Sequence, residues 1–296
     1  MKQNLIRLDT CPICGHQNHK AYLTVKDHST SQELFSIVEC SECHFLFTNP
    51  RPSDDSISEY YKSDKYISHT NQKTGWFARV YQVMRKEALK GKYKWISKHI
   101  KAGHLLDYGS GTGEFLDFMK NKSWQVKGIE IAEGPRSQSI KNYNLEVLAP
   151  TELENFKPNT FDVITLWHVL EHVGNLNETL EELVLKLKRN GILVLALPNP
   201  ESWDAKQYKD YWAAWDVPIH FYHFKKSDIK RIAEKIGLEL IEIINMPFDA
   251  YYISLLSEEY KTGKKNWSKA LLNGMISNKN ASTDNASSLT YILRKL

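Results

Sequence analysis

The sequence lacks any hydrophobic run long enough to cross a membrane. Its longest apolar stretch, Gly191–Pro198, has the length of a strand, whereas a membrane-spanning helix needs about 20 apolar residues. The N-terminus, MKQNLIR, also lacks the long apolar core of a secretory signal. We therefore expect a cytoplasmic protein that has no membrane partner.

The sequence also has little net charge. The formal value of +4 does not by itself predict nucleic-acid binding, because such binding needs clustered positive charge. A small-molecule partner is therefore favoured over nucleic acid. Hydrophobic residues make up 42% of the chain and aromatic residues 11%, so a substantial folded core is expected over most of its length.

Cysteine is scarce, and all four cysteines lie near the N-terminus in two C-x-x-C pairs, Cys11/Cys14 and Cys40/Cys43. Two such pairs can present four thiolates to one tetrahedral zinc ion. Disulfides fit poorly in a chain without an export signal, and redox use or unligated cysteines are the remaining alternatives. The spacing favours a structural zinc ribbon over residues 1–50, because four sulfur ligands leave no open position for catalysis.

A glycine-rich turn inside the segment His104–Leu116 is the strongest functional motif. An apolar strand leads into Gly109, Gly111 and Gly113, and an amphipathic helix follows. Glycines permit backbone angles closed to other residues and let a ligand approach the main chain. A second apolar strand ends near Glu130, and an acid at this position of a βαβ unit accepts hydrogen bonds from ribose hydroxyls. The segment therefore predicts a nucleotide-type cofactor site, and a turn without a ligand is the alternative.

The turn has the pattern D-x-G-x-G-x-G from Asp107 to Gly113, which differs from the dinucleotide fingerprint G-x-G-x-x-G. It resembles motif I of the class I S-adenosylmethionine (SAM)-dependent methyltransferases. The resemblance implies SAM as the cofactor, together with a set of contact residues along the strand ends of that fold. These residues are Asp107, Gly109, Ser110, Gly111, Gly113, Glu130, Ile131, Thr151, Glu152, Trp167 and His168.

Strands and amphipathic helices alternate around this motif. Further strands are expected at residues 145–148, 161–167, 191–198, 238–245 and 287–294, and helices at 76–99, 176–187 and 227–237. The lysines and arginines of the 76–99 helix are interpreted as a solvated face. The order resembles the class I methyltransferase fold, which is an α/β fold with a doubly wound sheet of seven strands, here over residues 76–296. Residues 51–75 are interpreted as a linker or partial lid. Residues 251–286 form an insertion that either covers the substrate or lies on the surface.

Two histidine-rich stretches are expected to meet at the carboxyl ends of the strands. The first holds His168, Glu171 and His172, and its L-E-H phrase resembles the loop after motif II of small-molecule methyltransferases. His168 and His172 would share one face if they lay on a helix. The second stretch holds His220 and His223.

These histidines admit three interpretations. In one, His220, or less readily His168 or His223, is a general base. In another, His168, Glu171, His172 and His220 bind a divalent ion, because the stretch resembles the E-x-x-E-H site of the small-RNA 2′-O-methyltransferases, although His168 replaces its first Glu. In the third, each histidine is a hydrogen-bonded anchor of its loop.

The sequence as a whole therefore resembles a SAM-dependent methyltransferase with a zinc-ribbon head and a small-molecule acceptor, for which a sugar is one candidate. An RNA-modifying methyltransferase whose ribbon grips nucleic acid, or a non-catalytic SAM-binding adaptor, are the alternatives. An aromatic group in the segment before His220 either forms a lid over the acceptor or packs in the core. Its members are Trp203, Tyr208, Tyr211, Trp212 and Trp215.

Overall fold

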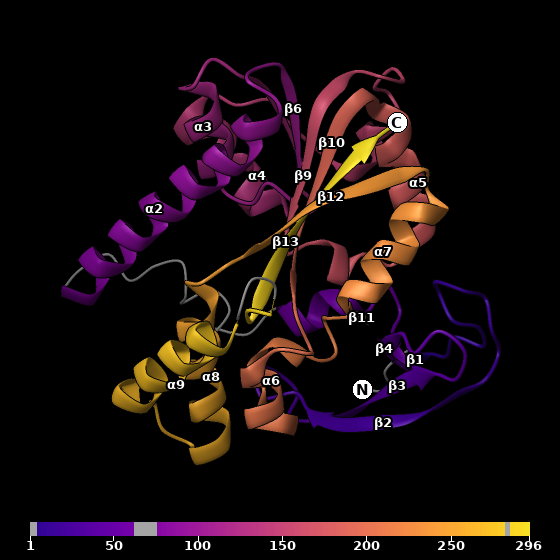
Figure 1. The fold of residues 1–296 in the computed structure, drawn as a ribbon, viewed down its shortest axis with the longest axis vertical. Coiled ribbons are helices and arrows are strands. Elements are labelled where there is room, and N and C mark those ends of the chain that lie inside the picture. Colours follow the sequence, from indigo (N-terminus) through magenta and orange to yellow (C-terminus); the bar gives the residue numbers. More distant parts are fainter. Residues whose placement is uncertain (1–4, 62–75, 282–284) are drawn as a thin grey trace.

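A mixed sheet of seven strands, in the order β12-β13-β10-β9-β6-β7-β8, forms the centre of the protein (Figure 1). The computed structural model describes residues 5–61, 76–281 and 285–296. The strands are β6 (His104–Tyr108), β7 (Gln125–Ile129), β8 (Val147–Leu148), β9 (Phe161–Trp167), β10 (Leu187–Pro198), β12 (Leu238–Asn245) and β13 (Ser288–Lys295). Six of them run in one direction, and β13 lies antiparallel between β10 and β12. The doubly wound class I methyltransferase fold is therefore confirmed.

Helices cover both faces of this sheet, which explains why its central strands read as continuous apolar runs. On one face, α2 (Trp76–His99) and α3 (Glu114–Lys120) pack against Val163 and Val194. On the other face, the strands meet α5 (Leu176–Lys186) and α7 (Lys226–Lys235). The helix α4 (Glu133–Tyr143) follows β7. No helix in the described ranges combines the length and apolarity that crossing a bilayer requires.

The N-terminal segment forms a second, smaller sheet with the order β11-β4-β3-β2. Its strands are β2 (His19–Lys26), β3 (Leu34–Cys40), β4 (Leu46–Thr48) and, from far along the chain, β11 (Tyr222–His223). A short pair, β1 (Leu5–Ile6) and β5 (Arg51–Pro52), and the 3-10 helix η1 (Ile57–Tyr61) complete this part. Because β11 pairs with β4, the ribbon shares a sheet with the methyltransferase part. The remainder of the segment expected as a linker or partial lid, residues 62–75, lies outside the described residues.

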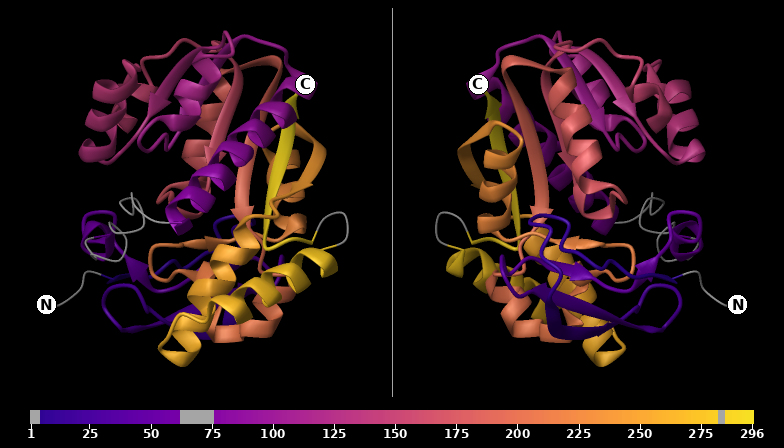
Figure 2. Two further views of the ribbon diagram at one scale, coloured as in Figure 1. Left: turned by 90° about the vertical axis from the view of Figure 1, so that its left-hand side faces the viewer. Right: turned by 90° about the vertical axis from the view of Figure 1, so that its right-hand side faces the viewer.

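A group of helices lies beside the ribbon, below the large sheet where β9 and β10 end (Figure 2). It contains α6 (Trp203–Tyr208), the 3-10 helices η4 (Lys209–Tyr211) and η5 (Ala213–Trp215), and a hairpin of α8 (Asp249–Thr262) and α9 (Trp267–Asn280). This hairpin occupies most of the insertion expected at 251–286. Of the expected aromatic lid, Tyr208, Trp212 and Trp215 are buried in a core cluster, so these three rings pack in the interior.

Candidate cofactor and active site

The turn between β6 and α3 contains three glycines, and one of them, Gly111, leaves open space beside its main chain. Gly109, Gly111 and Gly113 all have positive φ, at 81°, 54° and 86°, which favours glycine. A Cβ on Gly109 would lie 2.3 Å from Val169, and one on Gly113 would lie 2.7 Å from Ser139. A Cβ on Gly111 would have no atom of the described residues within 4 Å. A ligand can therefore approach the main chain at Gly111.

Glu130 follows the neighbouring strand β7 and connects it to this opening. Its carboxyl group accepts hydrogen bonds from the N–H groups of Gly111 at 2.7 Å and of Ala132 at 2.9 Å. Each carboxyl oxygen keeps a further lone pair that a ribose hydroxyl could use. Ile131 is 80% exposed beside it, as an apolar contact for a planar base would be. The 3-10 helix η2 (Pro150–Leu153) places the exposed residues Thr151 and Glu152 after β8.

Asp107 and Trp167 occupy neighbouring strands of the same edge. Asp107 is buried and accepts a 2.6 Å hydrogen bond from Thr165 on β9. Burial raises the pKa of Asp107 to about 6, although Thr165 and Lys92 oppose the shift. The Lys92 ammonium lies 4.0 Å from the centre of the Trp167 ring. Burial lowers the pKa of Lys92 to about 8, while Asp107 and Asp249 raise it.

His168 leaves the end of β9 with a positive φ of 56° and therefore does not share a helix with His172. Its Nε2 lies 3.0 Å from Asp249 and its Nδ1 lies 3.4 Å from Glu171. Burial lowers the pKa of His168, but the hydrogen bonds to Asp249 and Glu171 outweigh it and raise the pKa to about 10. An imidazolium has no lone pair, so these contacts weigh against His168 as a base.

Glu171, His172 and His220 form a compact cluster below the end of β9. One ligand atom from each lies within 4.8 Å of the other two, and the two imidazole centres are 4.6 Å apart. Glu171 and His172 belong to the 3-10 helix η3 (Leu170–His172), and a backbone bond from Phe221 to the Glu171 carbonyl holds the second stretch against it. The structure thus brings together the two histidine-rich stretches.

The hydrogen bonds of this cluster fix the orientation of both rings. The Nδ1 atoms of His172 and His220 each lie 3.0 Å from a backbone carbonyl, of Ile219 and Ala214 respectively. A carbonyl only accepts, so each Nδ1 carries the proton and each Nε2 keeps its lone pair. Glu171 is fully buried, and its carboxyl group forms an ion pair with the Nδ1 atom of His168 at 3.4 Å. Burial lowers the pKa of His220 well below its usual range, and His172 and His223 lower it further.

His223 lies apart from this cluster, inside the contact between β11 and β4. Its Nε2 is 3.2 Å from the Thr48 hydroxyl and its ring packs 5.1 Å from Trp215. Burial lowers the pKa of His223 to about 3. These contacts favour an anchoring role.

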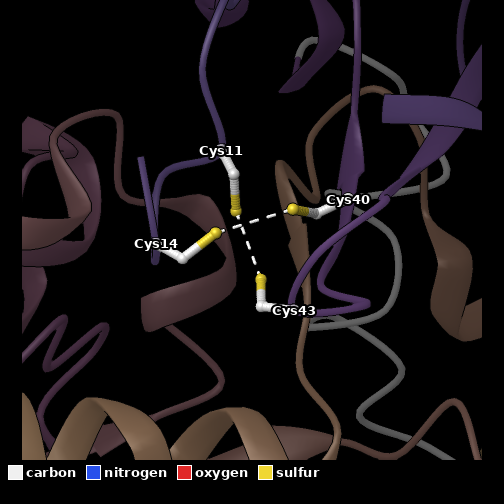
Figure 3. A group of neighbouring side chains, drawn as sticks. All are labelled: Cys11, Cys14, Cys40 and Cys43. Atoms are coloured by element: carbon white, nitrogen blue, oxygen red, sulfur yellow. Dashed lines mark hydrogen bonds between the residues drawn. The ribbon is translucent and has the colours of Figure 1, made fainter. Parts of the chain in front are cut away.

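The four N-terminal cysteines converge at the tip of the ribbon (Figure 3). The sulfurs of Cys11 and Cys43 are 3.5 Å apart and those of Cys14 and Cys40 are 3.6 Å apart, which is too far for a disulfide. Four sulfurs at about 2.3 Å from a zinc ion would stand roughly 3.8 Å from one another in a tetrahedron. The donor set and its spacing therefore fit such an ion.

One basic and one acidic side chain near the end of β9, those of Lys92 and Asp249, belong to no sequence motif. Lys92 lies on a helix whose charges were expected to face solvent, and Asp249 begins a helix 81 residues away from its partner His168. Only the tertiary structure places them beside the end of β9. A lysine every few residues along the 76–99 helix gave no signal that one of them points inward.

An α/β sheet with an open glycine turn and an acid at the end of the next strand defines a nucleoside-cofactor protein of the methyltransferase type. The chain belongs to the methyltransferase domain family, whose model matches residues 81–243, more than half of its length. It is 26% identical over 168 residues to a ubiquinone biosynthesis O-methyltransferase of Idiomarina loihiensis, covering 52% of this chain and 69% of that protein. The enzyme of the same name from Dechloromonas aromatica is 26% identical over 185 residues, covering 57% and 78%.

Among solved structures, phosphoethanolamine N-methyltransferase 2 of Haemonchus contortus, in complex with S-adenosyl-L-methionine, shares the fold. Its TM-score is 0.52 at 14% sequence identity, and the match covers 94% of this chain and 68% of that one. Family and fold agree with the open turn at Gly111 and the acid at Glu130. The chain is a SAM-dependent methyltransferase.

Proposed function

We propose that the chain transfers the methyl group of SAM to a hydroxyl oxygen of a small-molecule acceptor. The observation that carries this proposal is the cluster of Glu171, His172 and His220, where an imidazole lone pair is held next to a buried carboxyl group. A hydroxyl must lose its proton as it attacks, whereas many other acceptors need no base. The O-methyltransferase names of the relatives agree with an oxygen acceptor.

In the proposed reaction, the turn at Gly111 and the Glu130 carboxyl group hold the nucleoside part of SAM. The acceptor oxygen lies in line with the methyl group, so that the new O–C bond forms as the C–S bond breaks. The hydroxyl proton passes to Nε2 of His220, because Nδ1–H of the same ring already donates a hydrogen bond to the Ala214 carbonyl. The Glu171 carboxyl group then stabilises the imidazolium, and S-adenosylhomocysteine leaves.

A divalent cation is the second candidate for the same cluster, and the convergence of one ligand atom each from Glu171, His172 and His220 within 4.8 Å favours it. Glu171, His172 and His220 would supply one oxygen and two nitrogen ligands, and backbone carbonyls already orient both rings as partners of metal-bound histidines do. When bound, such an ion would lower the pKa of a coordinated hydroxyl.

We also propose that the four cysteines hold one structural zinc ion.

The nucleic-acid alternative is less well supported, because basic residues near the ribbon serve its packing. Arg231 and Lys225 donate to the carbonyls of Cys43 and His44 at 3.1 and 2.7 Å. The ribbon therefore turns one side of its second cysteine pair toward α7.

The first experiment incubates the purified chain with methyl-labelled SAM and fractionated metabolites, nucleic acid and protein. We expect label in the metabolite fraction, and loss of at least about a hundredfold in rate for His220→Gln, within the range that general bases contribute. His44→Gln, on an exposed histidine of the ribbon, is the matched control and should keep full activity. Label in nucleic acid alone, or full activity of His220→Gln, contradicts the proposal.

Metal analysis of the same preparations separates the base from the cation. A cation in the cluster predicts a second metal ion besides zinc, which Glu171→Gln loses while the zinc remains. A preparation that holds zinc alone, and whose rate does not respond to added magnesium or manganese, overturns the cation and leaves His220 as the base.

A further inference from the structure

Helix α9 carries its large apolar side chains on the side that faces solvent. Trp267, Leu271, Leu272 and Met275 are each more than half exposed. Positions 267, 271 and 275 are four residues apart, so they line one side of the helix. A surface helix normally turns such a stripe toward the core. In α9 this pattern is reversed.

The opposite side of α9 consists of small and polar residues whose contacts fix the rotation of the helix. Asn273 donates a 2.7 Å hydrogen bond to a tyrosine of α6, and Ser277 donates one of 2.9 Å to Asp204. A Cβ on Gly274 would lie 2.5 Å from the Tyr251 ring, so no larger side chain fits against α8. The helix cannot turn its apolar stripe inward without breaking these buried hydrogen bonds.

Within residues 261–280, which include the stripe, the charged side chains have one sign. Residues 261–280 contain five exposed lysines and no aspartate or glutamate, although the whole chain has a net charge of only +4. Lysines precede the stripe and also follow it, at positions 261, 264, 265, 269 and 279. Lys265 and Lys269 form ion pairs with Glu259 and Glu258 of α8, which offset part of this positive charge. An apolar surface edged by cations has the chemistry of a site for an anionic interface.

We propose that the α8–α9 hairpin docks the protein on the surface of an anionic lipid bilayer. Amphipathic helices that lie in the interface place Trp and Leu at the acyl boundary and lysines among the headgroups, and Trp is enriched at that depth. A second copy of the chain fits less well, because a twofold contact over α9 would bring the same lysines together. The proposal departs from the expectation, made from the absence of a spanning segment, that the protein has no membrane partner.

The hairpin that carries the exposed stripe of α9 begins beside the proposed active site. Asp249, the first residue of α8, bonds to His168 at the end of β9. Phe248 precedes it and is also exposed, and Asn278 of α9 donates to the Pro247 carbonyl at 2.8 Å. A bilayer in contact with the hairpin therefore lies at the same end of the molecule as the catalytic cluster.

Vesicle co-sedimentation of the full chain tests this proposal. We expect binding to phosphatidylcholine vesicles that contain phosphatidylglycerol, little binding to phosphatidylcholine alone, and weaker binding at high salt. The double variant Leu271→Ser/Met275→Ser and the charge variant Lys264→Glu/Lys265→Glu should each bind at least about tenfold more weakly. Ile140→Ser, on the exposed side of α4, is the control and should bind as the unmodified chain does.

Three outcomes overturn the proposal. The first is the absence of binding to anionic vesicles, and the second is equal binding by the Leu271→Ser/Met275→Ser variant. The third is a dimer by light scattering that this variant makes monomeric, which would assign the stripe to a second copy. The substituted residues are exposed, so the variants should fold normally. Thermal unfolding at an unchanged temperature checks this. Turnover of a soluble acceptor without vesicles tests the proposed reaction separately.

Discussion

At the scale of single residues, the three glycines of the cofactor turn meet different demands although all have positive φ. Gly109 and Gly113 are required by close packing, against Val169 and Ser139. Gly111 faces open space, and its N–H donates to the Glu130 carboxyl group. Packing glycines support the fold, whereas Gly111 leaves room for the ligand.

This difference predicts opposite effects of two substitutions. Gly111→Arg should weaken SAM binding by at least about a hundredfold, or ~2.7 kcal/mol, because the side chain fills the cofactor space. Its unfolding midpoint should fall by only about 2–4 °C, since the left-handed conformation costs a non-glycine residue about 1–2 kcal/mol. Gly109→Ala should lower the midpoint further, because its methyl group meets Val169. Calorimetric titration with SAM and thermal melts measure both; unaltered SAM affinity of Gly111→Arg would refute the cofactor placement.

At the scale of elements, the first turn of α7 contains a buried acidic residue, Asp228. Asp228 accepts a 2.8 Å hydrogen bond from the Lys225 N–H, and its other carboxyl oxygen has no partner within the described residues. Burial raises the pKa of Asp228 to about 7, although the bond from Lys225 and the charge of Arg231 oppose the shift. Burial thus favours the protonated acid in the folded state, in spite of the hydrogen bond from Lys225.

The sign of this shift predicts how stability changes with pH. In the unfolded chain an aspartate titrates near 3.9, so the folded state binds the proton more tightly between about pH 4 and pH 7. Asp228 therefore makes the protein less stable as pH rises through that window, and has no further effect above it. Asp228→Asn should gain stability relative to the unmodified chain over the same window, as measured by denaturant unfolding at several pH values.

Asp162 provides the control, because its shift has the opposite sign. Burial raises the pKa of Asp162, but the hydrogen bonds from Lys188 and His104 outweigh it and lower the pKa. Its stabilising contribution is present above its unfolded pKa and is lost at lower pH. Asp162→Asn should therefore be less stable than the unmodified chain at neutral pH and approach it in acid. Parallel pH profiles for the two variants would contradict both assignments.

At the scale of the whole molecule, the sheet and the glycine turn could be predicted because local patterns encode them. The apolar run of β10 is one unbroken stretch of sequence, and so is the glycine turn after β6. Periodicity and spacing therefore identify each of them. The His168–Asp249 bond joins residues 81 apart, and the inward position of Lys92 depends on the rotation of α2. The pairing of β11 with β4 likewise depends on tertiary packing. No local pattern contains this information.

That pairing makes the ribbon part of one core with the methyltransferase sheet. The Phe45 ring lies 6.0 Å from Tyr222 and 5.5 Å from Phe224, and Thr48 of β4 donates a 2.7 Å hydrogen bond to the His220 carbonyl. A disordered ribbon would therefore expose the core and release the loop that carries His220. Loss of the metal should therefore also lower the methyl-transfer activity.

Removal of the proposed zinc ion should consequently destabilise the entire chain, not a separate head. Cys43→Ser is expected to lower the free energy of unfolding by at least about 3 kcal/mol, since binding at a structural zinc site contributes directly to folding. Scanning calorimetry should show one transition at a lower temperature, and methyl transfer should fall with it. Ser41→Ala, in the same cysteine loop but exposed, is the matched control. A second transition that leaves the methyltransferase part unchanged would show that the two sheets fold independently, because a shared core must melt as a unit.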